Sequence, residues 1–140
     1  EDAPARLTAG DQTIAVPSPG EPWPFIIRVG ADSAIVGLVD SEEQMYSGGG
    51  GSAAGVVLFK VSNGAAERLA ALPLSGSLMT RACFMEEDEQ KRAGACHDQY
   101  EFASRVRLDE TVTNGEPRIV LETAAGTFRR STPTRCRSRR

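Results

Sequence analysis

The sequence predicts an all-β protein: an antiparallel β-sandwich or small barrel of about seven or eight short strands. Short apolar runs alternate with turns rich in glycine and proline, of which the chain has 14 and 8. No stretch carries helix-forming residues over enough length to give more than one short helix. The connections are mostly short, as hairpins between antiparallel neighbours require.

The first part of the chain contains several candidate strands. Residues 11–16 alternate between polar and apolar side chains, which indicates a short strand with one buried face. Residues 17–24 carry four prolines, so this stretch fits an edge or a connection better than a central strand. Residues 25–29 and 34–39 are apolar runs separated by a turn-forming tetrapeptide, and they predict a hairpin.

The middle and the end of the chain continue the same pattern. Residues 54–61 are the most apolar candidate strand, and the Ser62-Asn63-Gly64 turn predicts that residues 68–74 return beside it. A second turn at residues 113–116 contains Asn-Gly, a pair that tolerates positive φ. Residues 118–124 then form the last predicted strand and should pair with the strand that precedes this turn.

Two cysteines bracket an acidic loop in the central stretch, residues 77–109. Cys83 and Cys96 stand at the two mouths of this loop, between two predicted strands. A disulfide there would remove unfolded-state entropy equivalent to about 3 kcal/mol. The alternative is a pair of reduced, buried cysteines in a cytosolic protein. The spacing favours the disulfide.

The loop between these cysteines is too polar to belong to a core. Residues 86–90 are all acidic or amide side chains. Glu87 and Lys91 form an i,i+4 pair of favourable order, which indicates a helical turn. Gly94 then suits the end of that turn, where φ is often positive.

The strand after the loop shows the longest alternation in the chain, over residues 98–109. We expect Arg105 and Arg107 to face water, because a register shift of one residue would bury both. The opposite face consists of Tyr100, Phe102, Ser104, Val106 and Leu108. Of these we expect Phe102, Val106 and Leu108 to face the core.

A glycine run is the most unusual local feature of the sequence. This run, residues 48–51, predicts either a flexible linker or a loop at a binding edge, where glycine lets the backbone approach a ligand. It is not a phosphate-binding loop, because no Lys follows the last glycine. A Ser52 nucleophile is also disfavoured, because the strong strand follows this serine instead of preceding it. The candidate binding loop consists of Tyr46, Ser47, Gly48, Gly49, Gly50, Gly51 and Ser52.

The sequence contains no persuasive catalytic or metal-binding set. His97 is the only histidine, and its neighbours Cys96 and Asp98 would point to the opposite face of a strand. Residues 86–89 lack the alternating acidic spacing of a calcium loop. We therefore expect no catalytic residues, no metal and no cofactor.

Charge divides the chain into a body, residues 1–128, and a basic tail, residues 129–140, which we expect to be disordered. Six of the 16 basic residues lie in the tail and all 19 acidic residues lie in the body, so the body has a net charge of 10 − 19 = −9. Such a body is unsuited to nucleic acid. We expect a single β-rich domain and no transmembrane segment, since no apolar run approaches the length of a membrane span.

The three cysteines favour an oxidising compartment, so we expect a secreted or periplasmic protein. The function that fits best is a non-enzymatic binding or accessory domain, such as an inhibitor-like module, whose partner is a protein or a small ligand. One alternative is a small hydrolase or metal-dependent enzyme that uses His97 with loop carboxylates. Another is a structural subunit whose edge strands pair with neighbours.

The cysteine pairing gives a direct prediction. If Cys83 and Cys96 are bonded, Cys136 in the tail is left over. Thiol counting on the denatured, unreduced monomer should then find a single free thiol. Three reactive thiols would contradict the disulfide and weaken the case for an oxidising compartment.

Overall fold

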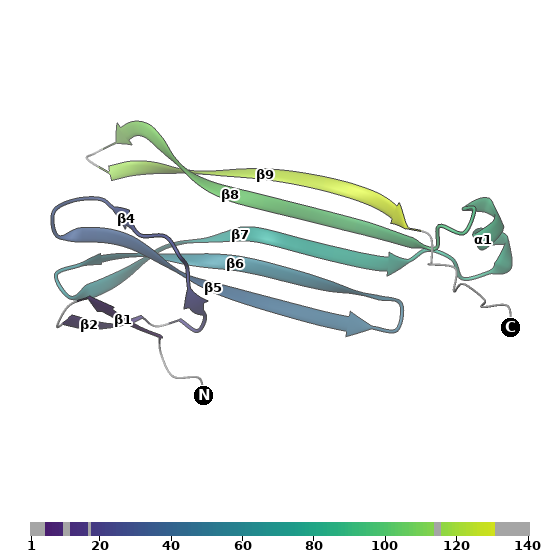
Figure 1. Ribbon diagram of the computed structural model, residues 1–140, viewed down its shortest axis with the longest axis horizontal. Helices are drawn as coiled ribbons and strands as arrows, with labels where there is room; N and C mark the ends of the chain where they lie inside the picture. The colour runs from purple at the N-terminus through teal and green to yellow at the C-terminus, as the bar shows by residue number, and fades with distance from the viewer. Residues whose placement is uncertain (1–4, 10–11, 17, 114–115, 131–140) are drawn as a thin grey trace, which may run out of the picture.

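A computed structural model describes residues 5–9, 12–16, 18–113 and 116–130, and most of these residues lie in antiparallel strands (Figure 1). The all-β class and the short helix are confirmed. The elements in chain order are β1 Ala5–Ala9, β2 Gln12–Val16, β3 Glu21–Pro22, β4 Ile27–Arg28, β5 Ser33–Tyr46, β6 Gly49–Ser62, β7 Ala65–Arg81, α1 Glu86–Lys91, β8 His97–Thr113 and β9 Glu116–Arg130.

The larger of two sheets is a meander in the order β3-β5-β6-β7-β8-β9, and β4 also pairs with β5. The smaller sheet is the β1–β2 hairpin. Within the described chain, β9 pairs only with β8, so the large sheet is open and does not close into a barrel. Strands β5 to β9 have 14 to 17 residues each and are longer than the short strands predicted.

The predicted hairpins are present. Ile27 lies opposite Ile35 in the β4–β5 pair. Asn63 and Gly64 both have positive φ, 51° and 75°, and they turn β6 into β7. The last hairpin pairs residues 102–108 of β8 with residues 119–125 of β9, as the sequence suggested.

The glycine run differs from its prediction as a loop or linker. The turn after β5 contains only Ser47 and Gly48, and the rest of the run is the beginning of β6. Gly49, Gly50 and Gly51 pair with β5 on one side and β7 on the other. Backbone pairing on both sides therefore holds a segment whose composition alone suggests a mobile connection.

The two apolar core clusters belong to the end of the sheet away from α1, where Figure 1 shows β1, β2 and β4. One cluster joins Val16 of the small hairpin to Leu38 and Phe59 of the large sheet. A second cluster contains Ile35, Val56 and Leu58, and the partly buried side chains packed on it include Trp23, Ile27, Leu74 and Ile119. Each cluster is thus covered by a segment that precedes β5 in the chain.

The other end of the sheet, next to α1, is a single layer that we call the distal half. Every residue of β5 from Asp40 to Tyr46 is exposed, although the first part of the same strand is buried. Leu78 and Tyr100 are also exposed there. The distal half consists of residues 40–46 of β5, 49–54 of β6, 75–81 of β7, 97–103 of β8 and 124–130 of β9.

Strand β8 leaves β7 after Ala103, where the pairing of these two strands ends. The gap beyond is an apolar cavity of about 480 Å³, and Trp23, Phe25 and Val106 are among the residues that line it. Leu108 lines this cavity, as its expected orientation requires, but it is 41% exposed and not buried, because β9 is the only strand that pairs with β8 there.

The outward-facing side chains of β8 are those that the sequence predicted. Arg105 and Arg107 are exposed, and both donate hydrogen bonds to Glu122 of β9, at 2.5 and 3.0 Å. These two bonds, that of Arg105 first, hold the pKa of the Glu122 carboxyl below its usual value of 4.5. Exposed ion pairs of this kind add little stability.

The predicted tail begins later than residue 129, because β9 extends to Arg130. Residues 131–140, with Cys136, lie outside the described part of the chain. In that described part, no helix has the length and apolar character to cross a membrane.

The uneven burial gives a stability prediction. Leu58 is fully buried, so Leu58→Ala should lower the free energy of unfolding by about 2–5 kcal/mol. Leu78 is 42% exposed in the distal half, and Leu78→Ala should cost less than about 1 kcal/mol. Urea denaturation of both variants makes the comparison. An equal loss in the two variants would mean that the distal half is covered in solution.

Candidate functional site

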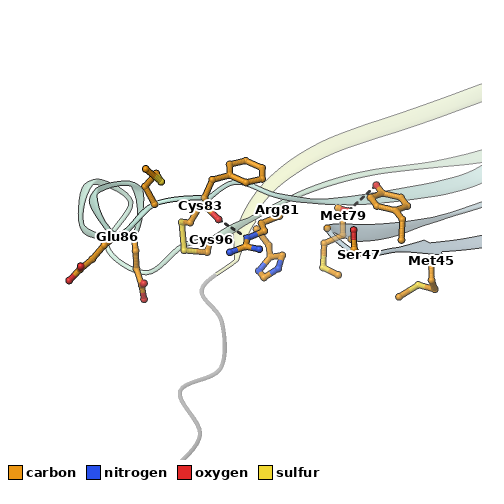
Figure 2. A pocket seen from close by; sticks show the side chains of 14 residues that line it. Met45, Ser47, Met79, Arg81, Cys83, Glu86 and Cys96 are labelled. Atoms are coloured by element: carbon orange, nitrogen blue, oxygen red, sulfur yellow. Dashed lines mark hydrogen bonds between the residues drawn. A yellow bond between two sulfur atoms is a disulfide. The ribbon is translucent and has the colours of Figure 1, made fainter.

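A cleft of about 710 Å³ lies at the distal end of the sheet, between the β5–β6 turn and the disulfide loop (Figure 2). It is the place where most features singled out in the sequence come together. The lining residues include Met45, Tyr46, Ser47, Gly48, Gly49, Met79, Arg81, Cys83, Phe84, Met85, Glu86, Glu89, Cys96 and His97.

The β5–β6 turn forms one wall and is fastened to β7. The carbonyl oxygen of Gly48 accepts a hydrogen bond from the Arg81 amide at 2.7 Å, and the Tyr46 hydroxyl donates to the Met79 carbonyl at 3.2 Å. Gly49 leaves no room for a side chain, because a Cβ there would lie 1.8 Å from the Met79 carbonyl oxygen. Glycine at this position therefore permits the close approach of β6 to β7.

The disulfide forms the opposite wall. The Sγ atoms of Cys83 and Cys96 are 2.10 Å apart, so the predicted pair is confirmed. The Ala82 amide also donates to the Cys96 carbonyl at 2.8 Å. These contacts extend the junction of β7 and β8 beyond their last paired residues, Arg81 and His97.

The loop closed by this disulfide contains α1, the helical turn expected from the sequence. Glu87 and Lys91 form the i,i+4 ion pair at 3.6 Å, and Gly94 has a φ of 80°. The Asp88 carboxylate accepts hydrogen bonds from the backbone amides of Phe84 and Met85, each at 3.1 Å. These bonds, first that of Phe84, lower the pKa of the Asp88 carboxyl.

Arg81 connects the two walls. Its Nε atom donates to the Cys83 carbonyl at 2.6 Å (Figure 2). Its guanidinium carbon lies 5.6 Å from the centre of the Phe84 ring, within the range of a cation–π contact. The positive charge of Arg81 is thereby directed toward the disulfide loop.

The structure divides the predicted binding loop. Tyr46, Ser47, Gly48 and Gly49 line the cleft together with both cysteines of the disulfide. Gly50, Gly51 and Ser52 line a smaller hollow of about 200 Å³ farther along β6. Whether either group binds a ligand stays a prediction.

Sequence reasoning missed the methionines. The chain has three, and all of them line the cleft: Met45, Met79 and Met85. They lie on β5, on β7 and directly before α1, so their proximity depends on strand register. The predicted disulfide was the one sequence feature that could have located the cleft, because it fixes which ends of β7 and β8 meet.

The arrangement offers little support for catalysis. His97 shares the cleft with Glu86 and Glu89, but no hydrogen bond in the described structure orients its imidazole. The Ser52 hydroxyl lies 2.9 Å from the Ser77 hydroxyl instead of near the histidine. Across the described residues, no three His, Cys, Asp or Glu side chains are grouped to hold a metal.

No family model, no curated protein and no solved structure matches this chain. The geometry of the cleft and of the strands around it is therefore the guide to function.

The Asp88 interactions give a pH prediction. Because the folded-state pKa of Asp88 lies below 3.8, its stabilising effect is present above that value and is lost as the pH falls through the folded pKa. A carboxyl NMR titration should place Asp88 below 3.8, and the Phe84 and Met85 amides should exchange faster once it is protonated. Asp88→Asn should remove this pH dependence. Unchanged amide exchange across the titration would contradict the assigned role.

Proposed function

We propose that the protein is a non-enzymatic binding module that recognises an extended segment of a partner protein. The observation that carries this proposal is the free edge of β5, which leads directly into the cleft. Strand β3 pairs with β5 at Val39 and Leu38, and β4 pairs with it earlier. In the described structure, residues 40–46 of β5 have β6 as their only neighbouring strand.

A free edge of this kind offers backbone donors and acceptors in a row. An extended peptide can add to it as a further strand, and its alternate side chains then reach nearby pockets. Here the edge ends at Met45 and Tyr46, which line the cleft. Phe84 and Met85, each 71% exposed, supply apolar surface on the other wall.

Charge indicates the chemistry of the partner. The free part of β5 carries Asp40, Glu42 and Glu43, all exposed. A partner strand with Lys or Arg opposite these residues and an apolar side chain near the cleft would complement both surfaces. The disulfide supports a secreted or periplasmic setting for this interaction.

A second candidate is an enzyme that uses His97 with Glu86 or Glu89, because all three line one cleft. A general base needs its imidazole oriented by a hydrogen-bond partner. The lack of such a partner among the described residues makes this candidate weaker than the binding module.

Charge reversal on the β5 edge tests the proposal. The protein, Glu42→Lys/Glu43→Lys and the control Glu67→Lys would each be used to capture proteins from the native compartment for mass spectrometry. Glu67 is exposed on β7 at the other end of the sheet. We expect the same partner with the unmodified protein and with Glu67→Lys, and at least about tenfold less with the double variant.

Hydrogen exchange on the complex then locates the contact, which should protect the amides of residues 40–46. Equal capture by all three proteins, or protection elsewhere, would overturn the proposal. Dimerisation of the purified chain, lost in the double variant, would instead identify a second copy as the occupant of this edge.

A further inference from the structure

Two methionines face each other across a glycine on the distal half. Met45 of β5 lies opposite Gly50 of β6, and Gly50 lies opposite Met79 of β7. Directly opposed residues of antiparallel strands point to the same face of a sheet. Figure 2 shows both thioether side chains on the same side of the strands.

Gly50 provides the space between them. The Sδ atom of Met45 lies 2.5 Å from the position that a Cβ of Gly50 would occupy. Met45 therefore extends over β6 toward Met79, and Gly50 is the one buried residue among the described side chains of the distal half. The Met45 side chain itself is 70% exposed, so burial in a core does not explain its position.

The only histidine of the chain lies on the same face. Met79 is opposite Gln99 of β8, and His97 is two residues from Gln99. Residues two apart on a strand share a face, which places His97 diagonally across from Met79. His97, Met45 and Met79 also line the same cleft.

The surroundings of the methionine pair suit a cation. The next row along this face carries Glu43 opposite Ser52 and Glu101 opposite Ser77. Arg81 lies opposite His97, but its guanidinium interacts with the Cys83 carbonyl and the Phe84 ring. Carboxylates therefore flank the thioethers on one side, and on the other side the Arg81 guanidinium is held by the Cys83 carbonyl and the Phe84 ring.

Gln99 supplies an independent sign that a partner is missing. Its Nε2 atom donates to Glu101, but its Oε1 atom is buried and has no hydrogen-bond partner. Buried polar atoms in native proteins nearly always have a partner, so this oxygen is a place where a hydrogen-bond donor or an ordered water can bind beside the methionine pair. This oxygen belongs to the row that contains Met45 and Met79.

We propose that Met45, Met79 and His97 form a binding site for monovalent copper, Cu(I). Thioether sulfur is a soft ligand that selects Cu(I) over magnesium or calcium, and imidazole is also a good copper ligand. Two thioethers and one imidazole give a three-ligand, uncharged set, and the neighbouring carboxylates balance the charge of the ion. This activity goes beyond the proposed protein binding and does not depend on it.

Methyl NMR of the methionines tests the site directly. The sample is the full chain with its disulfide intact and with Cys136→Ser, because a free thiolate would compete for copper. Cu(I) is added without oxygen as its acetonitrile complex, so no reductant is needed. Of the three methionine methyl signals, those of Met45 and Met79 should shift up to one equivalent, and that of Met85 should not. Zn(II) should leave all three signals in place.

Met85 is the matched control, because it has the same side chain and lines the same cleft from beside α1. Met45→Leu, Met79→Leu and His97→Ala should each weaken Cu(I) binding at least about tenfold, as measured by competition with bicinchoninate. Met85→Leu should leave the affinity unchanged. The leucine substitutions conserve volume, so circular dichroism should show the same fold.

Two outcomes overturn the proposal. In one, no methionine methyl shifts at one equivalent of Cu(I). In the other, Met85 shifts with the rest, or the Met45→Leu/Met79→Leu double variant keeps its affinity, which would mean scattered surface coordination. Protein capture on the β5 edge is measured separately and in the absence of copper, so failure of one proposal is distinguishable from failure of the other.

Discussion

Strand β6 is paired along its whole length, with β5 on one side and β7 on the other, and the rest of the structure depends on this pairing. Its second half carries Val56, Leu58 and Phe59, which are buried in the two apolar clusters. Its first half has glycine and small side chains and lies in a single layer. Backbone hydrogen bonds are the main link through which the packed end of the sheet can stabilise the exposed end, because few side chains pack there.

Local signals predicted much of the fold. The Asn63-Gly64 turn fixed one hairpin because both residues tolerate positive φ, and the cysteine spacing located the bond between Cys83 and Cys96. The alternation in β8 identified Arg105 and Arg107 as outward-facing. In each case the residues that determine the structure lie close in sequence, at most 13 positions apart.

The predictions that failed concern residues whose structure is decided by strands far away in sequence. Glycine is depleted in strands, so the run at the start of β6 resembled a linker, yet its partners in β5 and β7 make it a strand. Leu108 looked internal because alternation does not reveal where β8 leaves β7. The cleft was invisible for the same reason: Met45 and Met79 are far apart in sequence, and only the register across Gly50 brings them together.

The disulfide loop and the end of the β7–β8 pairing together determine which part of the β8–β9 hairpin is held by β7. The disulfide joins β7 and β8 near Cys83 and Cys96, and the pairing of these two strands ends at Ala103. Beyond Ala103 the β8–β9 hairpin is therefore not held by β7 and can tilt about that residue. A tilt of this hairpin would change the distance from Val106 to Trp23 across the apolar cavity. Because Trp23 is the only tryptophan in the chain, the tryptophan fluorescence of the protein would come from the lining of this cavity.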